Sequence, residues 1–189
     1  IQRQGALKNS DMNNYTVKLD ATQFAFNKKL KLELGVLGSV RDGKSQYDMQ
    51  KMFYSAAAYN PTYPTVKNSD GRWDEDLLAN EIYNPLGQLE ITNKNAENSL
   101  NTHGKATWTI LDGLFLSAFG SYTSINSDLK RYVPNDIRQG ELNGNGWAYL
   151  SNTKRTDIMG NVQLTYTKDF GKHHFDGLAL MEGQRYKTF

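Results

Sequence analysis

Apolar and polar side chains alternate in six short segments of the chain, and these segments form three pairs. The six segments are residues 15–21, 30–36, 105–110, 114–122, 162–166 and 175–181. A period of two places the apolar side chains on one face of an extended strand, so each pair predicts a β-hairpin. The apolar face of the last segment stays open, because Leu178 and Leu180 compete with Ala179 and Met181.

The connections between these segments alternate between short and long. Tight turns are predicted near Asn27, Asp112 and Gly171, whereas residues 42–97 and 126–152 form two long loops that contain Pro, Gly and Asn turn signals. Outer-membrane barrels have short periplasmic turns and longer extracellular loops, and soluble sandwiches do not usually show this alternation. We therefore assign the tight turns to the periplasm and both long loops to the exterior.

The predicted fold is all-β: an antiparallel, up-and-down transmembrane β-barrel wall of six strands arranged as three hairpins. Six strands are too few to close a membrane barrel, whose open edge would leave backbone groups unpaired in lipid. We therefore interpret residues 1–189 as a partial barrel domain whose other strands lie outside this sequence, which also begins without an initiator Met. One apolar segment within the first loop, residues 49–58, is suited to a short helix.

Composition and charge narrow the classes of function. The chain is 38% hydrophobic and 22% charged, as expected of a folded protein, and 16 Gly with 12% aromatic residues favour a β-protein with many turns. The net charge of +2 provides no concentrated basic surface, so we expect no nucleic-acid partner. The absence of Cys excludes a disulfide framework, and no apolar run approaches the ~20 residues of a membrane-spanning helix.

The sequence predicts neither an enzyme nor a cofactor or metal site, because no catalytic set of residues is arranged convincingly. His103 is isolated, and His173 and His174 are adjacent on a strand, where their side chains point to opposite faces. The acidic residues within 70–76 are the best calcium candidates, but their spacing does not follow a calcium-binding loop. We interpret them as part of a solvated loop.

Three stretches of the sequence resemble the SusC/RagA family of TonB-dependent transporters. Residues 59–64, which read YNPTYP, are followed by residues 70–71 and 84–86, as in a loop of that family. Residues 110–120 and 164–176 are similar to its periplasmic hairpins. The order and spacing of these stretches also match, and the likeness spans nearly the whole chain.

The resemblance implies an outer-membrane protein of a Gram-negative bacterium that imports glycans or peptides. Members of the family look like barrels of about 22 strands that are closed by an N-terminal plug and driven by the TonB complex. That complex would act through an N-terminal part that this sequence lacks. A surface lipoprotein of the SusD type caps such a barrel, and outer-membrane lipid surrounds it. Two alternatives remain at this point: a passive outer-membrane porin and a soluble carbohydrate-binding β-domain.

The candidate contact residues are aromatic side chains in the two long loops. Tyr59, Tyr63, Trp73 and Tyr83 lie in the first loop, and Trp147 lies in the second. Exposed aromatic rings stack on sugars or anchor a protein partner. The alternative is that they pack against one another and hold the loops in shape. We expect Tyr59, Tyr63 and Trp73 to lie at or near the contact with the cap or the cargo.

Strand residues are assigned to lipid or lumen by the same alternation. Leu32 and Leu34 are predicted to face lipid, whereas Lys31 and Glu33 are predicted to face the lumen. Three strand aromatics are candidates for the belts that line the two membrane interfaces. These residues are Trp108, Tyr122 and Tyr166.

Overall fold

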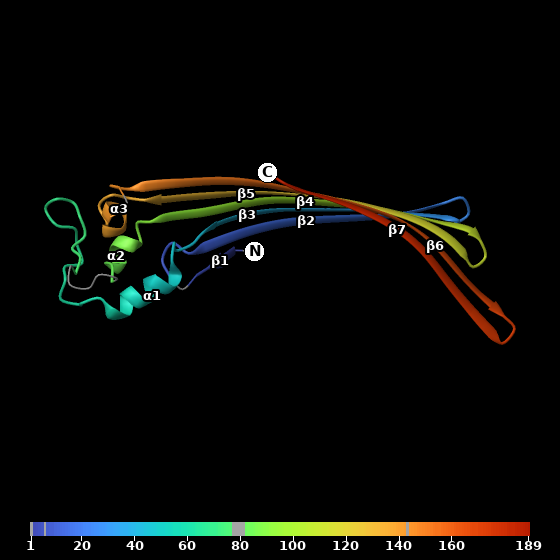
Figure 1. Cartoon of the computed structure of the whole chain (residues 1–189), viewed down its shortest axis with the longest axis horizontal. Helices are drawn as coiled ribbons and strands as arrows, with labels where there is room; N and C mark the ends of the chain where they lie inside the picture. The colour runs from blue at the N-terminus through green and yellow to red at the C-terminus, as the bar shows by residue number, and fades with distance from the viewer. Residues whose placement is uncertain (1, 6, 77–81, 143) are drawn as a thin grey trace. The chain divides into compact units, whose positions relative to one another are not determined.

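The computed structural model describes residues 2–5, 7–76, 82–142 and 144–189 (Figure 1). The chain forms one antiparallel up-and-down sheet whose strands are ordered β1 to β7, as they occur in the sequence. The strands are β1 (Gln2–Gln4), β2 (Asp11–Ala25), β3 (Leu30–Lys44), β4 (Thr92–Leu111), β5 (Leu114–Val133), β6 (Trp147–Phe170) and β7 (His173–Thr188). The three predicted hairpins are therefore confirmed, and the very short β1 is a seventh strand that the sequence pattern did not predict.

All three tight turns lie where they were predicted. Phe26, Asn27 and Lys28 all have positive φ angles in the turn between β2 and β3. Gly113 has a φ of 83° in the second turn, and a Cβ atom there would lie 2.2 Å from the carbonyl oxygen of Thr167 on β6. Only glycine tolerates both this backbone conformation and this approach. The turn conformation and the close approach of β6 therefore both require glycine at position 113.

The strands extend farther than the hydrophobic pattern indicated. Residues 42–44 still belong to β3, and β4 begins at Thr92, so the first long connection covers residues 45–91. The second covers residues 134–146 instead of 126–152. Polar residues occupy both faces of these strand ends, which removes the alternation that marks a strand with one apolar face. Residues 77–81 of the first loop lie outside the described residues.

The register of β6 and β7 determines the face that the sequence left open. Ala179 lies opposite Leu164 and Met181 lies opposite Val162, whereas Leu178 lies opposite Thr165. Directly paired residues point to the same side of a sheet. The apolar face of β7 therefore carries Ala179 and Met181, and Leu178 lies on the polar face.

Contacts between Cα atoms divide the chain into two compact units. The loop-side unit comprises Ile1–Asn14, Arg41–Glu97 and Ser127–Asn152, and the turn-side unit comprises Tyr15–Val40, Asn98–Asn126 and Thr153–Phe189. Among the described residues, every fully buried apolar side chain belongs to the loop-side unit. The turn-side unit consists of strands, and large apolar side chains remain exposed on it.

The described residues of the loop-side unit form three helices, namely α1 (Met49–Ala58), α2 (Pro85–Gln88) and α3 (Arg138–Leu142). Helix α1 is the segment, residues 49–58, for which the sequence predicted a short helix. Asp48 caps its N-terminus by accepting a hydrogen bond from the Lys51 amide at 2.9 Å. Within the described part of the chain, no helix is long and apolar enough to cross a membrane.

Candidate functional site

Asn84 organises the first long connection, because its side chain is almost wholly buried and fully hydrogen-bonded. Its Oδ1 accepts a hydrogen bond from the Leu86 amide at 2.9 Å and caps α2, whose first residue is Pro85. Its Nδ2 donates to the carbonyl oxygen of Asp74 at 2.9 Å and to the hydroxyl of Tyr59 at 3.1 Å. The Asn-Pro-Leu motif thus begins a helix and fixes two distant parts of the loop at once.

Burial raises the pKa values of two ionisable groups beside Asn84, those of Tyr59 and Glu75. Burial, with the nearby Glu75 carboxylate, raises the pKa of Tyr59 to about 12. Its hydroxyl therefore stays protonated and donates to the carbonyl oxygen of Asp74 at 2.6 Å. Burial also raises the pKa of Glu75, although the backbone amides of Asn84 and Arg138 donate hydrogen bonds to it. The centre of this loop is therefore a fixed, solvent-poor polar cluster.

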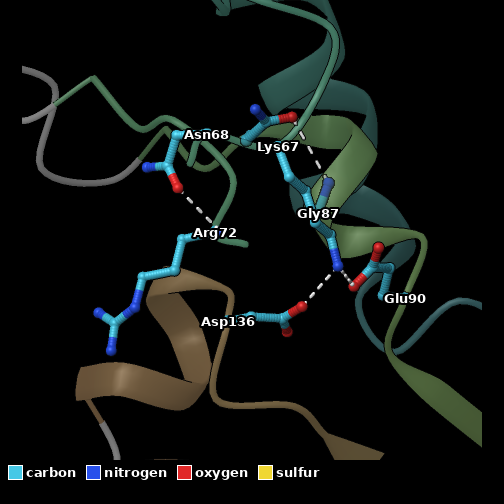
Figure 2. Close-up of polar contacts among 7 residues, drawn as sticks. Lys67, Asn68, Arg72, Gly87, Glu90 and Asp136 are labelled. Atoms are coloured by element: carbon cyan, nitrogen blue, oxygen red, sulfur yellow. Dashed lines mark hydrogen bonds and ion pairs between the residues drawn. The ribbon is translucent and has the colours of Figure 1, made fainter. Parts of the chain in front are cut away.

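Ion pairs join the first connection to the second (Figure 2). Lys67 lies between two carboxylates, with its Nζ 3.0 Å from Oε2 of Glu90 and 2.5 Å from Oδ2 of Asp136. Arg72 forms a further pair with Glu141 at 2.6 Å. Burial opposes the charge of Asp136, but the contact with Lys67 outweighs it and holds the Asp136 pKa below its usual value. The two connections therefore form one structure.

Trp73 and Trp147 pack against a small apolar core between the two connections. This core consists of Ile91, Val133 and Ile137. Gly87 lies close to both Trp73 and the core, since a Cβ atom on it would be 3.2 Å from the indole ring. A larger residue at this position would have to displace the ring.

The structure places the five predicted contact residues as two pairs and one separate residue. Tyr59 and Tyr63 have ring centroids 5.6 Å apart, and Trp73 and Trp147 share the apolar core. Tyr83 lies apart, with the ammonium group of Lys51 4.2 Å from its ring centre. All five are half-buried. They contribute to the packing of the loops, and their contact with a cap or cargo stays a prediction.

Sequence reasoning missed a cationic face on the strands of the loop-side unit. Arg131 donates from Nε to the side-chain oxygen of Asn93 at 3.3 Å and stacks on Tyr47, with 4.3 Å between its guanidinium carbon and the ring centre. Tyr47 in turn meets Trp147 edge-on at 5.9 Å. Isolated arginines on different strands have no spacing that a sequence pattern would reveal. Only strand pairing brings them together.

Arg41 lies on the same face as Arg131. Its guanidinium is 3.8 Å from Glu97, and Glu97 also accepts a hydrogen bond from Ser127 at 3.4 Å. Glu97 and Asn93 are four residues apart on β4, so they share a face of the strand. Arg3 joins them, because it pairs with Met12 on β2, and Met12 lies beside Gly43 of the neighbouring β3.

We give the name inner arginine face to Arg3, Arg41, Asn93, Glu97 and Arg131, together with Tyr47, which contacts Arg131. A cavity of about 430 Å³ is lined by Arg3 and Arg41 of this face, together with Asp11 and Lys44, which also line a depression on the opposite face. Each guanidinium has five N–H donors. The face is therefore suited to binding oxyanions such as carboxylates.

The three histidines lie on β4 and β7. His173 pairs with Phe170 and His174 with Asp169, so the two imidazoles occupy opposite faces of β7. His103 lies close to Gly35, where a Cβ atom would overlap the ring. The described residues contain no group of three or more side chains placed to hold a metal ion.

No family model matches the sequence, and neither does any curated protein. Solved structures do match it. The RagAB peptide importer in its open-open state aligns with 95% of this chain and 20% of its own, with a TM-score of 0.65 and 16% identity. The ferric-catecholate import receptor Fiu from Escherichia coli K12 aligns with 96% of this chain and 27% of its own, with a TM-score of 0.56 and 11% identity.

The siderophore receptor PiuA from Acinetobacter baumannii gives a TM-score of 0.53 at 16% identity, covering 99% of this chain and 25% of its own. The sheet has the fold of a segment of these neighbours' barrels. The predicted likeness to RagA is confirmed for the fold of this segment. At such low identities the likeness concerns the fold of a barrel segment. The chain spans only about a fifth to a quarter of each neighbour's length.

Proposed function

We propose that this chain is part of the wall of an energy-coupled importer in the outer membrane of a Gram-negative bacterium. The observation that carries the proposal is the fold: an unclosed antiparallel sheet with tight turns and two structured long connections, which aligns with TonB-dependent barrels over at least 95% of the chain. One barrel wall serves many cargoes, so the fold supports import in general. Peptides or glycans are the proposed cargo.

The exposed side chains of the turn-side unit support a lipid environment. Val17, Leu19 and Leu34 each expose more than 60% of their surface, and they alternate with charged residues along their strands. On β3 those charged residues, Lys31 and Glu33, pair at 2.7 Å on the opposite face. In a barrel the first face contacts lipid and the second faces the lumen.

The test is uptake of a labelled peptide or oligosaccharide mixture by cells that carry the intact protein, with and without a functional TonB complex. Energy-coupled import predicts that uptake ends when TonB is removed while the amount of barrel in the outer membrane is unchanged. Uptake that continues without TonB would support a passive porin and refute the proposal. A protein that fractionates as a monomer without detergent would support the soluble alternative.

The proposed partner is a surface lipoprotein of the SusD type, held by the long connections. Replacing Tyr59, Tyr63 and Trp73 with Ala in the intact protein tests the proposed contact. Loss of the lipoprotein from the purified complex, with a loop that still resists protease, supports direct contact. A loop that becomes cleavable shows that the three rings serve the loop's own packing, which the Tyr59–Tyr63 contact and the apolar core around Trp73 already favour in part.

A further inference from the structure

The two faces of the loop-side strands differ in charge. The inner arginine face has three arginines and one strand carboxylate, that of Glu97. The opposite face forms a depression of about 380 Å³ in which positive and negative charges balance. Its charged residues are Asp11, Asp42, Asp128, Lys44, Lys94 and Lys130. The sheet therefore presents a cationic surface on one side only.

The arginines of the inner face keep most of their binding capacity. Within the described part of the chain, Arg131 has two contacts, one through Nε to Asn93 and one through its flat face to Tyr47. Its terminal N–H groups are not used by either contact. Arg41 is 3.8 Å from Glu97, which is a long ion pair, and its side chain is 46% exposed. Both guanidinium groups can therefore still donate hydrogen bonds to an oxyanion.

The proposed function takes the inner arginine face as the lumen side. Arg41 is eight residues beyond Glu33 on the same strand, and even spacing keeps both on one face. Glu33 lies on the face that the proposed function assigns to the lumen. Cargo that enters beneath the loops would therefore meet Arg41 and Arg131, with Tyr47 and Trp147 beside them.

We infer that the inner arginine face binds the carboxylates of an extended cargo, so that this importer selects acidic oligomers. The inference rests on the proposed function, because it takes this face as the lumen. Arginine binds a carboxylate through two parallel hydrogen bonds, and the adjacent rings offer a surface on which a cargo chain can stack. The carboxylates come from acidic side chains of a peptide or from uronic acid units of a glycan.

Arg131 and its neighbour Lys130 provide a matched test, because they are adjacent on β5 and point to opposite faces. Arg131→Gln and Lys130→Gln remove the same charge from the protein. Binding to the purified intact protein is measured with a fluorescent hexapeptide that contains three Glu residues and with the same peptide carrying Gln instead. An oligogalacturonate and a neutral oligosaccharide of equal length distinguish the glycan source.

The expected result is a preference of the unmodified protein for an acidic probe over its neutral counterpart, which weakens as salt is raised. Arg131→Gln should lower affinity for that acidic probe roughly tenfold, as for loss of a hydrogen bond to a charged group. It should leave the neutral probe unchanged. Lys130→Gln should leave the affinities for both probes unchanged, and Glu97→Gln should tighten binding of the acidic probe. If the preferred probe is the glycan, the carboxylate chemistry stands and the peptide source is excluded.

Equal affinities of the unmodified protein for acidic and neutral probes would overturn the inference, and so would equal effects of Arg131→Gln and Lys130→Gln. Arg131→Lys keeps the charge beside Tyr47 but loses the two-pronged guanidinium, so its affinity for the acidic probe should lie between those of the unmodified protein and Arg131→Gln. Unchanged affinity of both variants for the neutral probe separates lost recognition from lost folding. TonB-dependent uptake without acidic preference would refute this inference alone. Acidic preference without TonB dependence would refute the proposed function alone.

Discussion

Replacing Asn84 with Ala should open the first long connection without affecting the barrel strands. The side chain is 1% exposed, and each lost hydrogen bond leaves a half-buried partner. Loss of the helix cap costs about 1 kcal/mol. Loss of the two hydrogen bonds from Nδ2 costs about 1 kcal/mol each. We expect the free energy of local opening to fall by about 3 kcal/mol, which corresponds to a roughly 100-fold larger open population.

The assay is limited proteolysis of the intact protein in detergent, followed by mass mapping of cuts within the first connection. When opening and closing are fast relative to cleavage, the cleavage rate reports the open population. Asn60→Ala is the matched control, because Asn60 is exposed and its side chain accepts only local hydrogen bonds from Thr62. We expect that control to change the rate by less than about threefold, as for a surface substitution.

A second variant separates the two roles of this side chain. Asn84→Asp keeps an acceptor for the cap of α2 but removes the donor to Asp74 and Tyr59, and it introduces a carboxylate beside the buried Glu75. It should therefore open the loop at neutral pH even though the cap is retained. If the Asn84→Ala variant is cleaved no faster than the Asn60→Ala variant, the polar cluster does not hold the loop and the prediction is wrong.

Three further predictions concern the sheet and the ion pairs. Leu32→Arg should impair assembly of the intact protein, because a charge on the lipid face costs ~2–4 kcal/mol. The measurement is the amount of the heat-modifiable folded form. Lys31→Leu should not reduce that amount, and equal amounts for the two variants would contradict the face assignment. Gly113→Ala should destabilise the barrel, since its φ is 83° and a Cβ atom there would meet the backbone carbonyl oxygen of Thr167, whereas Gly38→Ala meets nothing within 4 Å and should be neutral in the same melting assay. The folded pKa of Asp136 is lowered, so its stabilising contribution is present above the ordinary Asp value and is lost as pH falls through the folded value. Pepsin cleavage of the loops should thus rise below about pH 4, and Asp136→Asn should remove that dependence.

The sequence was most informative about the hairpins. A period of two across residues 30–36 specifies one apolar face, and an Asp-Gly pair at 112–113 specifies a turn, so both features are local. The same pattern could not place Leu178, because apolar residues occupy adjacent positions there and only the pairing with β6 decides the face. It also ended each long strand too early, since polar strand ends carry no alternation.

The candidate site depended on contacts that no local pattern records. The aromatic residues of the long connections were identified by composition, but Trp73 meets its core through residues more than 50 positions away, such as Val133. The inner arginine face was missed entirely, since Arg41 and Arg131 lie 90 positions apart on two different strands. Side chains that converge through strand pairing become visible only when the register is known.

The order of strands in the sheet has a practical consequence for handling the polypeptide. Among the described residues, β1 and β7 are the two outermost strands, and β7 pairs only with β6 along its 16 residues. Its other side presents a row of unpaired amide and carbonyl groups, which is a template for the addition of another strand. In the isolated polypeptide a second copy can occupy that position, and the exposed apolar face will reinforce the association. Preparations of these 189 residues alone will therefore tend towards ordered aggregates, and refolding should be judged by light scattering before any binding curve is interpreted.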